Sequence, residues 1–480
     1  MAKENIMENR TKIVCTIGPA SSSIGVLKDM VKAGMDVARL NFSHGDHDSN
    51  AELIEKVREA SKSVGRPVAI LLDLQGPKIR VGELPGEGLT LKEGSIVKLQ
   101  AGVAVADRGV IPVPYDRLAH DLKRGDRILI ADGTRELQVL DISGQMISAK
   151  VLLGGTLISY KGINVPSVAL SIESMTEKDK EDLQFGLRYD LDFVALSFVR
   201  AAEDVKKLRA FIAKHISEDT LPPHIVVKIE KYEALKNFDE ILEETDAVMI
   251  ARGDLGLETP VTQVPLRQKE LIAKCLIAGK PAIVATEMLA SMEHNPRPTR
   301  AEVSDVANAV IDHTDAVMLS GESAMGRYPV KAVQVMADII EQTEESPLDS
   351  LMPKPGITQE TVPAALGAAA VELGRRISAD AILVTTESGY SARMAARLRP
   401  EIPLFAATAS PRTYKQLILS WGVTAIQAEG YGEPYQMVEE ARKVMKKVYG
   451  IKSGSKVVVM SGLKREGKGG FDTALRVVEI

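Results

Sequence analysis

Eight short runs of aliphatic and β-branched residues alternate with longer amphipathic stretches over most of the first 345 residues. The runs lie at 11–18, 37–43, 68–74, 192–198, 225–230, 247–253, 282–288 and 316–322. Near-continuous hydrophobic runs of this length are typical of strands buried on both faces. Several of the stretches between them open with Ser or Thr followed three positions later by an acidic residue, which is a helix-capping pattern. The pattern therefore predicts eight strand–helix units.

Eight such units favour a closed (β/α)8 TIM barrel built from residues 1–74 and 167–345. An open doubly wound sheet is the alternative, but such a sheet rarely needs eight parallel strands. Residues 75–166 interrupt the alternation of strand-like runs and helix-like stretches, because they contain short strand-like pieces separated by Gly and Asp-Gly turns. This stretch predicts an inserted small β-barrel domain that acts as a lid over the barrel mouth. From Ser346 a Pro-containing linker leads into a third domain, 346–480, whose alternating pattern predicts an α/β parallel sheet.

Composition narrows the possible functions. The 480 residues include 60 Lys and Arg against 65 Asp and Glu, for a net charge of -5, which argues against a dedicated nucleic-acid binder. Two cysteines, Cys15 and Cys275, exclude a disulfide scaffold and fit a reducing compartment. No apolar run reaches the length of about 18 residues that a membrane helix needs, and the first residues lack the apolar segment of a secretory signal. We therefore expect a cytoplasmic protein without nucleic-acid or membrane partners.

Polar side chains recur where the predicted strands end, and barrels of this kind carry their active sites at that edge. Lys228 and Glu230 alternate along one run, so their side chains point the same way, and Asp254 follows the adjacent run. Two carboxylates with room for water suit Mg²⁺ or Mn²⁺. The ammonium of Lys228 and the guanidinium of Arg39 suit a phosphate or carboxylate. This set predicts phosphoryl transfer, and the same charges would also stabilise an enolate.

Several long motifs resemble those of the pyruvate kinase family. They are TKIVCTIGPAS, MDVARLNFSHG, LLDLQGPKIR, VVKIEKYEAL, VMIARGDLG, PRPTRAEVSDVANAV and VMLSGESA. The resemblance extends from about Thr11 to the C-terminus and includes the insertion and the third domain. It implies an enzyme that transfers the phosphoryl group of phosphoenolpyruvate to ADP, giving pyruvate and ATP in the last step of glycolysis.

The resemblance also implies a role for individual residues. Lys228 would stabilise the phosphoryl group in flight, Arg39 would hold the phosphate, and Thr286 would lie where a proton reaches the enolpyruvate. Further roles are metal binding by Glu230 and Asp254, substrate-carboxylate binding by the backbone of Arg252, Gly253 and Asp254, nucleotide contacts from His44, Arg80 and Lys161, and a proton relay that includes Ser320 and Glu322.

A monovalent cation site is a further implication of the resemblance. Its oxygen ligands would be Asn41, Ser43, Asp73 and the carbonyl of Leu74. Many relatives have Glu at the position of Lys78, and in relatives with Lys there the K⁺ requirement is lost. The ammonium of Lys78 would occupy the K⁺ pocket, so we expect K⁺ to be dispensable. We still expect Mg²⁺ or Mn²⁺ to be required, because Glu230 and Asp254 would bind it. Glu287 and Met325 also depart from the usual family pattern, without touching the metal ligands.

Two segments of the third domain carry candidate anion sites. The segment TTESGYSAR places a Thr/Ser/Gly-rich turn before a helix, and it resembles the effector-phosphate loop of the family. Its candidate ligands are Thr385, Thr386, Ser388, Gly389 and Ser391, and a plain helix cap is the alternative. The basic loop 462–470 nearly matches a P-loop but has Gly469 where Ser or Thr should bind the metal, so we expect a surface loop or an effector contact. The resemblance further favours a homotetramer.

Two other functions stay open at this point. A metal-dependent carbon–carbon lyase on a related barrel would use the same carboxylates, but it would not need the lid domain, His44 or Arg80. A catalytically silent, effector-binding relative would be expected to lack Lys228, Glu230 or Thr286, and all three residues are present.

Overall fold

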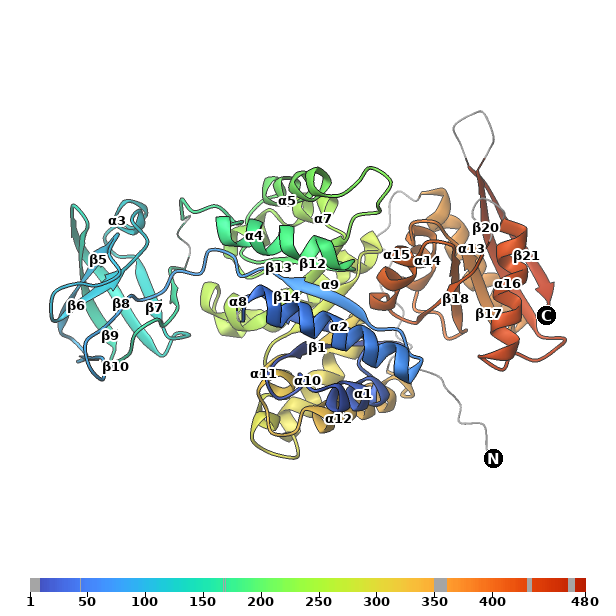
Figure 1. The fold of residues 1–480 in the computed structure, drawn as a ribbon, viewed down its shortest axis with the longest axis horizontal. Coiled ribbons are helices and arrows are strands. Elements are labelled where there is room, and N and C mark those ends of the chain that lie inside the picture. Colours follow the sequence, from blue (N-terminus) through green and yellow to red (C-terminus); the bar gives the residue numbers. More distant parts are fainter. Residues whose placement is uncertain are drawn as a thin grey trace.

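The computed structural model describes residues 9–43, 45–166, 168, 170–348, 361–429, 434–464 and 471–480. The predicted nucleotide contact His44 and most of the basic loop 462–470 lie outside the described residues. Three bodies follow one another along the long axis of the molecule, with the lid at one end, the barrel in the middle and the C-terminal domain at the other end (Figure 1).

Eight parallel strands close into a barrel in the order β1-β16-β15-β14-β13-β12-β3-β2. They are β1 Lys12–Ile17, β2 Val37–Asn41, β3 Ala69–Asp73, β12 Phe193–Leu196, β13 His224–Ile229, β14 Ala247–Ala251, β15 Ala282–Ala285 and β16 Ala316–Leu319. Each strand coincides with one of the eight hydrophobic runs, and the closed barrel confirms the predicted fold class. The barrel interior is filled by side chains such as Val14, Leu71 and Met249, so the barrel is a packed core and not a pore.

Helices surround the barrel and bury their apolar faces against the outside of the strands. The longer ones are α1 Ile24–Ala33, α2 His47–Val64, α4 Glu177–Gly186, α5 Ala202–His215, α9 Val264–Ala278, α10 Arg300–Ile311 and α12 Pro329–Glu344. Shorter helices are α6 Tyr232–Lys236, α7 Phe238–Glu244, α8 Arg252–Glu258 and α11 Gly321–Ala324. Thr176 and Thr299 form capping boxes at the starts of α4 and α10, as the sequence pattern predicts.

The insertion after β3 forms a six-stranded sheet in the order β11-β7-β8-β9-β5-β6, together with a two-stranded β10-β4 pair. The strands are β4 Leu89–Leu91, β5 Ile96–Ala101, β6 Val110–Val113, β7 Arg127–Ile130, β8 Arg135–Ser143, β9 Met146–Leu153, β10 Gly155–Leu157 and β11 Ile163–Asn164, with the short helix α3 Leu118–Asp121. The lid has its own hydrophobic core, which includes Leu99, Ile111 and Ile147. It therefore stands apart from the barrel and is joined to it by two chain segments (Figure 1).

The C-terminal domain contains a five-stranded sheet in the order β19-β18-β17-β20-β21. Its elements are α13 Val362–Ile377, β17 Ala381–Thr385, α14 Tyr390–Ala396, β18 Leu404–Thr408, α15 Pro411–Gln416, β19 Val423–Gln427, α16 Pro434–Lys447, β20 Lys456–Lys464 and β21 Phe471–Glu479. Strands β17, β18, β19 and β20 pair in parallel, as the predicted α/β parallel sheet requires, and only the last strand, β21, departs from it by pairing antiparallel with β20. Only residues 465–470 separate the two strands, whereas a parallel crossover needs about a dozen residues or more.

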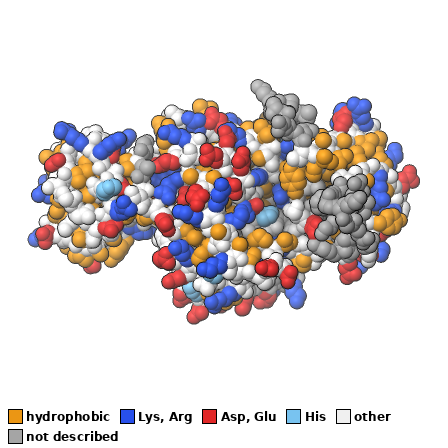
Figure 2. All heavy atoms as spheres, turned by 90° about the horizontal axis from the view of Figure 1, so that it is seen from above, with side chains coloured by type: hydrophobic (Ala, Val, Ile, Leu, Met, Phe, Trp, Pro, Cys, Tyr) orange, Lys and Arg blue, Asp and Glu red, His pale blue; other side chains and the backbone are white. Residues whose placement is uncertain are grey.

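The surface is mixed in charge. On the face shown in Figure 2, Lys and Arg side chains alternate with Asp and Glu over the barrel and the lid, as the composition suggests. Among the described residues, no helix combines the length and the hydropathy that a bilayer crossing requires.

Candidate active site

The ammonium of Lys228 lies at the centre of a buried polar cluster at the carboxyl ends of the barrel strands. Its Nζ donates to Ser197 Oγ at 2.9 Å and lies 2.9 Å from Glu230 Oε1 and 3.5 Å from Asp73 Oδ1. Strands β3, β12 and β13 are neighbours in the barrel, which brings these residues together although they are far apart in the sequence. The cluster therefore holds one cation between two buried carboxylates.

Arg39 joins the cluster from β2. Its Nε donates to Asp73 Oδ2 at 2.7 Å, and its Nη2 lies 2.6 Å from the same oxygen. Its Nη1 donates to Thr16 Oγ1 at 2.8 Å. The Thr16 hydroxyl in turn donates to the carbonyl oxygen of Leu319. Because Asp73 and Thr16 hold the guanidinium from two sides, Arg39 is positioned before any anion arrives.

Burial and charge act in opposite directions on the pKa values of this cluster. Burial alone would raise the pKa of Asp73, but Lys228 and Arg39 outweigh it and hold that pKa below its usual range. Burial would lower the pKa of Lys228, but Asp73 and Glu230 raise it, so the ammonium stays charged. The site thus keeps its cation and the Asp73 carboxylate ionised at neutral pH.

Glu230 and Asp254 form the candidate metal site. Glu230 is 1% exposed, and its Oε2 accepts a hydrogen bond from the backbone N–H of Phe198 at 2.7 Å. Burial, opposed by Lys228 and reinforced by the neighbouring Asp254, raises the pKa of Glu230. Two carboxylates that repel each other in this way would be stabilised by a divalent cation between them.

The donor set fits Mg²⁺ or Mn²⁺. Among the described residues, no group of three or more His, Cys, Asp or Glu side chains is arranged to hold a metal ion. A divalent ion would therefore take its remaining ligands from water and substrate oxygens, which is how proteins usually bind Mg²⁺.

Thr286 follows β15 and contacts the start of α8. It has a φ of 71°, its Oγ1 donates to the carbonyl oxygen of Ala285 at 2.6 Å, and it accepts from the N–H of Gly253 at 2.8 Å. Arg252 donates to the Thr286 carbonyl oxygen at 2.7 Å and to Asp305 at 2.8 Å. These bonds join the predicted proton-delivery residue to the predicted carboxylate-binding turn.

Lys78 lies where the chain leaves the barrel for the lid. Its Nζ is 3.9 Å from Asp254 Oδ1, whereas the ion pairs of Asp73 are with Arg39 and Lys228. The structure therefore differs from the expectation that this ammonium would occupy the K⁺ pocket beside Asp73. Its flexible stem extends toward α8 and not toward Asp73 at the end of β3.

The predicted K⁺ ligands are partly engaged in local hydrogen bonds. Asn41 Oδ1 accepts from the N–H of Ser43 at 3.1 Å, and the carbonyl of Leu74 accepts from Ser197 Oγ at 2.8 Å. These carbonyl and amide oxygens keep a second lone pair for a cation.

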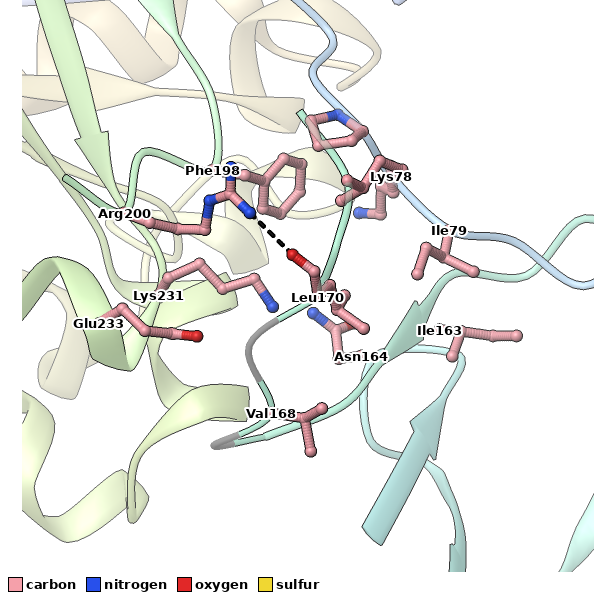
Figure 3. A pocket seen from close by; sticks show the side chains of 12 residues that line it. Lys78, Ile79, Ile163, Asn164, Val168, Leu170, Phe198, Arg200, Lys231 and Glu233 are labelled. Carbon is pink, nitrogen blue, oxygen red and sulfur yellow. Dashed lines mark hydrogen bonds between the residues drawn. The ribbon is translucent and has the colours of Figure 1, made fainter. Parts of the chain in front are cut away.

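A narrow cavity of about 30 Å³ separates the lid connections from the barrel. Figure 3 shows Lys78 on one side of it and Arg200, Lys231 and Glu233 of the barrel on the other. Arg200 donates to the carbonyl oxygen of Leu170 at 2.8 Å, which ties the returning connection to the barrel (Figure 3). The cavity therefore adjoins the candidate site through Lys78, whose Nζ lies 3.9 Å from Asp254 Oδ1.

The other predicted residues are less closely connected to Lys228. Arg80 donates to the carbonyl oxygen of Tyr160 at 3.2 Å, and Lys161 is exposed, so the described contacts of both lie within the lid region. Glu322 is buried and accepts from the N–H groups of Leu289 and Ser320, and burial raises its pKa.

In the predicted effector loop, Thr385 and Thr386 are buried while Ser388 is exposed. The Thr386 hydroxyl accepts from the N–H of Gly389 at 3.0 Å, and Gly389 has a φ of 78° at the start of α14. Ser391 lies in the first turn of α14. The loop therefore shows local turn capping, and it leaves the Ser388 side chain accessible.

Sequence reasoning missed Thr16 and Asp305, which hold Arg39 and Arg252. A signal for Thr16 was present, because it is a polar residue near the carboxyl end of an otherwise apolar run. Asp305 lies on a helix among other polar residues, and its sequence context carries no comparable signal.

Comparison with known proteins gives a consistent result. The family model "Pyruvate kinase, barrel domain" matches residues 8–333, and "Pyruvate kinase, alpha/beta domain" matches residues 364–478. A pyruvate kinase of Geobacillus stearothermophilus is 44% identical over 95% of this chain and 78% of its own length, and one of Clostridium perfringens is 38% identical over 96% and 98%. A crystal structure of a pyruvate kinase from Cryptosporidium parvum superimposes with a TM-score of 0.90 at 36% identity, covering 99% of this chain and 98% of that one. On the fold, the two family models and these relatives together, the chain belongs to the pyruvate kinase family.

Proposed function

We propose that this chain transfers the phosphoryl group of phosphoenolpyruvate to ADP and so forms pyruvate and ATP. The observation that supports this most is the Lys228 cluster, in which a charged ammonium lies beside the candidate metal ligand Glu230 and shares the Asp73 carboxylate with the held guanidinium of Arg39. Phosphoryl transfer needs preorganised positive charge more than covalent chemistry, because charge spreads over the transferred oxygens in the transition state.

In this mechanism the protein residues position and stabilise the reacting groups. Arg39 would bind the substrate phosphate, and Lys228 would stabilise the phosphoryl group as it moves. A divalent ion held by Glu230 and Asp254 would supply Lewis-acid stabilisation of phosphate and enolate oxygens. The Thr286 hydroxyl would lie on the path by which a proton reaches the methylene carbon of the enolpyruvate.

A coupled assay tests this function directly. Pyruvate formation should require phosphoenolpyruvate, ADP and Mg²⁺ or Mn²⁺ together. A chain that forms no ADP-dependent pyruvate under these conditions does not have the proposed activity. Release of pyruvate from a larger carbon skeleton without ADP would instead support the lyase alternative.

We also propose that the enzyme does not need K⁺. The Lys78 ammonium already adds a positive charge at the mouth, 3.9 Å from Asp254, and this charge would supply the electrostatic stabilisation of substrate anions that a bound K⁺ would otherwise give. Activity should therefore persist when tetramethylammonium replaces K⁺.

The variant Lys78→Glu should create a K⁺ requirement, and the exposed lid residue Lys150 supplies a matched control as Lys150→Glu. Loss of wild-type activity without K⁺ would contradict the proposal.

Two assembly properties remain proposals that rest on the family. The first is a homotetramer, which sedimentation tests, and a particle near the 51.9 kDa of one chain would contradict it. The second is a phosphorylated effector at Thr385–Ser391, which phosphate-ester binding to wild type and to Ser388→Ala would test. We also expect the enzyme to be located in the cytoplasm, which cell fractionation would test.

A further inference from the structure

We propose that a cavity between the barrel and the C-terminal domain binds a small oxyanion, the phosphate or carboxylate group of a metabolite, through Lys280 and Arg393. The cavity measures about 430 Å³ and lies between α14 and the loops that lead into β14 and β15. In Figure 1, α14 lies on the side of the C-terminal domain that faces the barrel. Both domains therefore contribute to the site, which is separate from the Lys228 cluster and does not depend on the proposed function.

Most of the charges around this cavity are already paired. Arg209 lies 3.1 Å from Asp246, and Glu244 lies 3.5 Å from Lys206 on α5. The third carboxylate on the lining, Glu243, is exposed to solvent.

Lys280 and Arg393 differ from these pairs. The Lys280 ammonium donates to the carbonyl oxygens of Leu242 and Glu243, and Arg393 donates weakly to the carbonyl oxygen of Ser388 at 3.4 Å. Among the described residues, neither cation has a carboxylate within 4.0 Å. Burial lowers the pKa of both groups, and the Asp246 carboxylate, which also pairs with Arg209, offsets this effect only in part.

An anion is the ligand that this arrangement would stabilise. A guanidinium and an ammonium both donate hydrogen bonds to phosphate and carboxylate oxygens, and these charge-assisted bonds are stronger than neutral ones. The volume of the cavity is in the range that holds a small metabolite. The hydroxyl-bearing ring of Tyr390 lines the same space and offers a further polar contact.

Binding here would link the two domains. Lys280 belongs to the barrel, and Arg393 belongs to α14, whose first residues follow the loop 385–389. An anion that contacts both cations would hold α14 against the barrel. Since it would bind only the folded arrangement, it would also raise the unfolding temperature of the full chain.

The first test locates the anion. Crystals of the full chain are soaked in tungstate, a phosphate analogue with a strong anomalous signal. We expect an anomalous peak between Lys280 and Arg393. Absence of a peak at this position, with peaks elsewhere, would overturn the proposal.

The second test measures binding by titration calorimetry with inorganic phosphate and, in a separate arm, with malonate. Lys280→Gln and Arg393→Gln should each weaken binding at this cavity at least tenfold, while Arg393→Lys keeps the charge and retains most of it. The exposed Arg375 on α13 supplies the control Arg375→Gln, which should bind as the wild type does.

Each outcome of the titration has a defined meaning. Binding of both anions assigns a general oxyanion site, and binding of phosphate alone assigns a phosphate-bearing ligand. Unchanged binding in both glutamine variants, or binding of neither anion to the wild type, would overturn the proposal. Circular dichroism of each variant checks that it is folded, and if one fails, the other still decides.

Discussion

At the scale of single residues, Lys228 is where the charges of the site meet. Its ammonium contacts Asp73 at the end of β3, Ser197 directly after β12 and Glu230 directly after β13. This convergence makes its charge preorganised, because nothing has to rearrange when negative charge develops nearby.

The variant Lys228→Met should therefore lower turnover by at least about 10²–10³-fold, the effect expected of one preorganised charge. Thr286→Ala should slow ATP formation less, because its hydroxyl contacts Gly253 and Ala285 and is not part of the Lys228 cluster. Single-turnover measurement of ATP, with proton exchange into pyruvate followed separately, distinguishes the two roles. Equal losses of ATP formation in both variants would contradict this division.

Thr16 is expected to act as a positioning residue through Arg39. Thr16→Val keeps the shape but removes the hydroxyl that accepts from the guanidinium, and one hydrogen bond to a charged group contributes about 1.5–3 kcal/mol. The KM for phosphoenolpyruvate should rise by roughly tenfold or more, with a smaller change in kcat. Thr16→Ser restores the hydroxyl and should recover most of the affinity. A Ser variant as weak as the Val variant would indicate a packing effect instead.

At the scale of elements, helix ends connect the site to the rest of the barrel. The α10 capping box uses Thr299 and Glu302, and the same Glu302 carboxylate accepts from the N–H and the hydroxyl of Ser291. One side chain thus holds both the start of α10 and the turn after β15. The helix also carries Asp305, which positions Arg252.

Thr299→Ala should lower the free energy of unfolding by about 1 kcal/mol, the usual effect of losing an N-cap. Thr299→Ser keeps the capping oxygen and should stay close to wild type. Denaturant titration of the three proteins measures the difference. An unchanged midpoint in the Ala variant would show that Glu302 alone holds this helix start.

At the scale of the whole molecule, a buried ion pair joins the barrel to the C-terminal domain. Arg399 lies 3.2 Å from Asp315, which follows α10 and precedes β16, and it also stacks 4.8 Å over the ring of Trp421. Asp315 additionally accepts from the backbone N–H of Trp421. This contact fixes the position of the third domain against the amino ends of the barrel strands.

Arg399→Leu leaves the Asp315 carboxylate buried without its cation, so it should destabilise the chain by about 3–5 kcal/mol. The double variant Arg399→Leu with Asp315→Leu should lose less than the sum of the two single variants, because neither charge is then left alone. Thermal unfolding measures both, and a separate early transition would indicate that the C-terminal domain has come apart from the barrel. Additive losses would mean that the two side chains act independently.

The predictions from sequence succeeded where the signal was local. The eight barrel strands followed from continuous hydrophobic runs, and the capping boxes at Thr176 and Thr299 followed from residues three positions apart. The strand-end position of Lys228, Glu230 and Asp254 followed from the same periodicity. Assignment of their chemistry needed the family motifs, because polar strand ends by themselves fit more than one reaction.

By itself, then, the sequence determined the barrel, the presence of a lid and a third domain, and the edge of the barrel at which the candidate site lies, because hydrophobic periodicity and turn residues act over short distances along the chain. Only the tertiary structure decided that Lys78 pairs with Asp254, that Thr16 holds Arg39, that β21 runs antiparallel to β20, and that Lys280 and Arg393 face one cavity. Each of these depends on which residues distant in sequence become neighbours and on where a flexible side chain finds its partner. Packing of complete elements determines such contacts, and no local pattern encodes them.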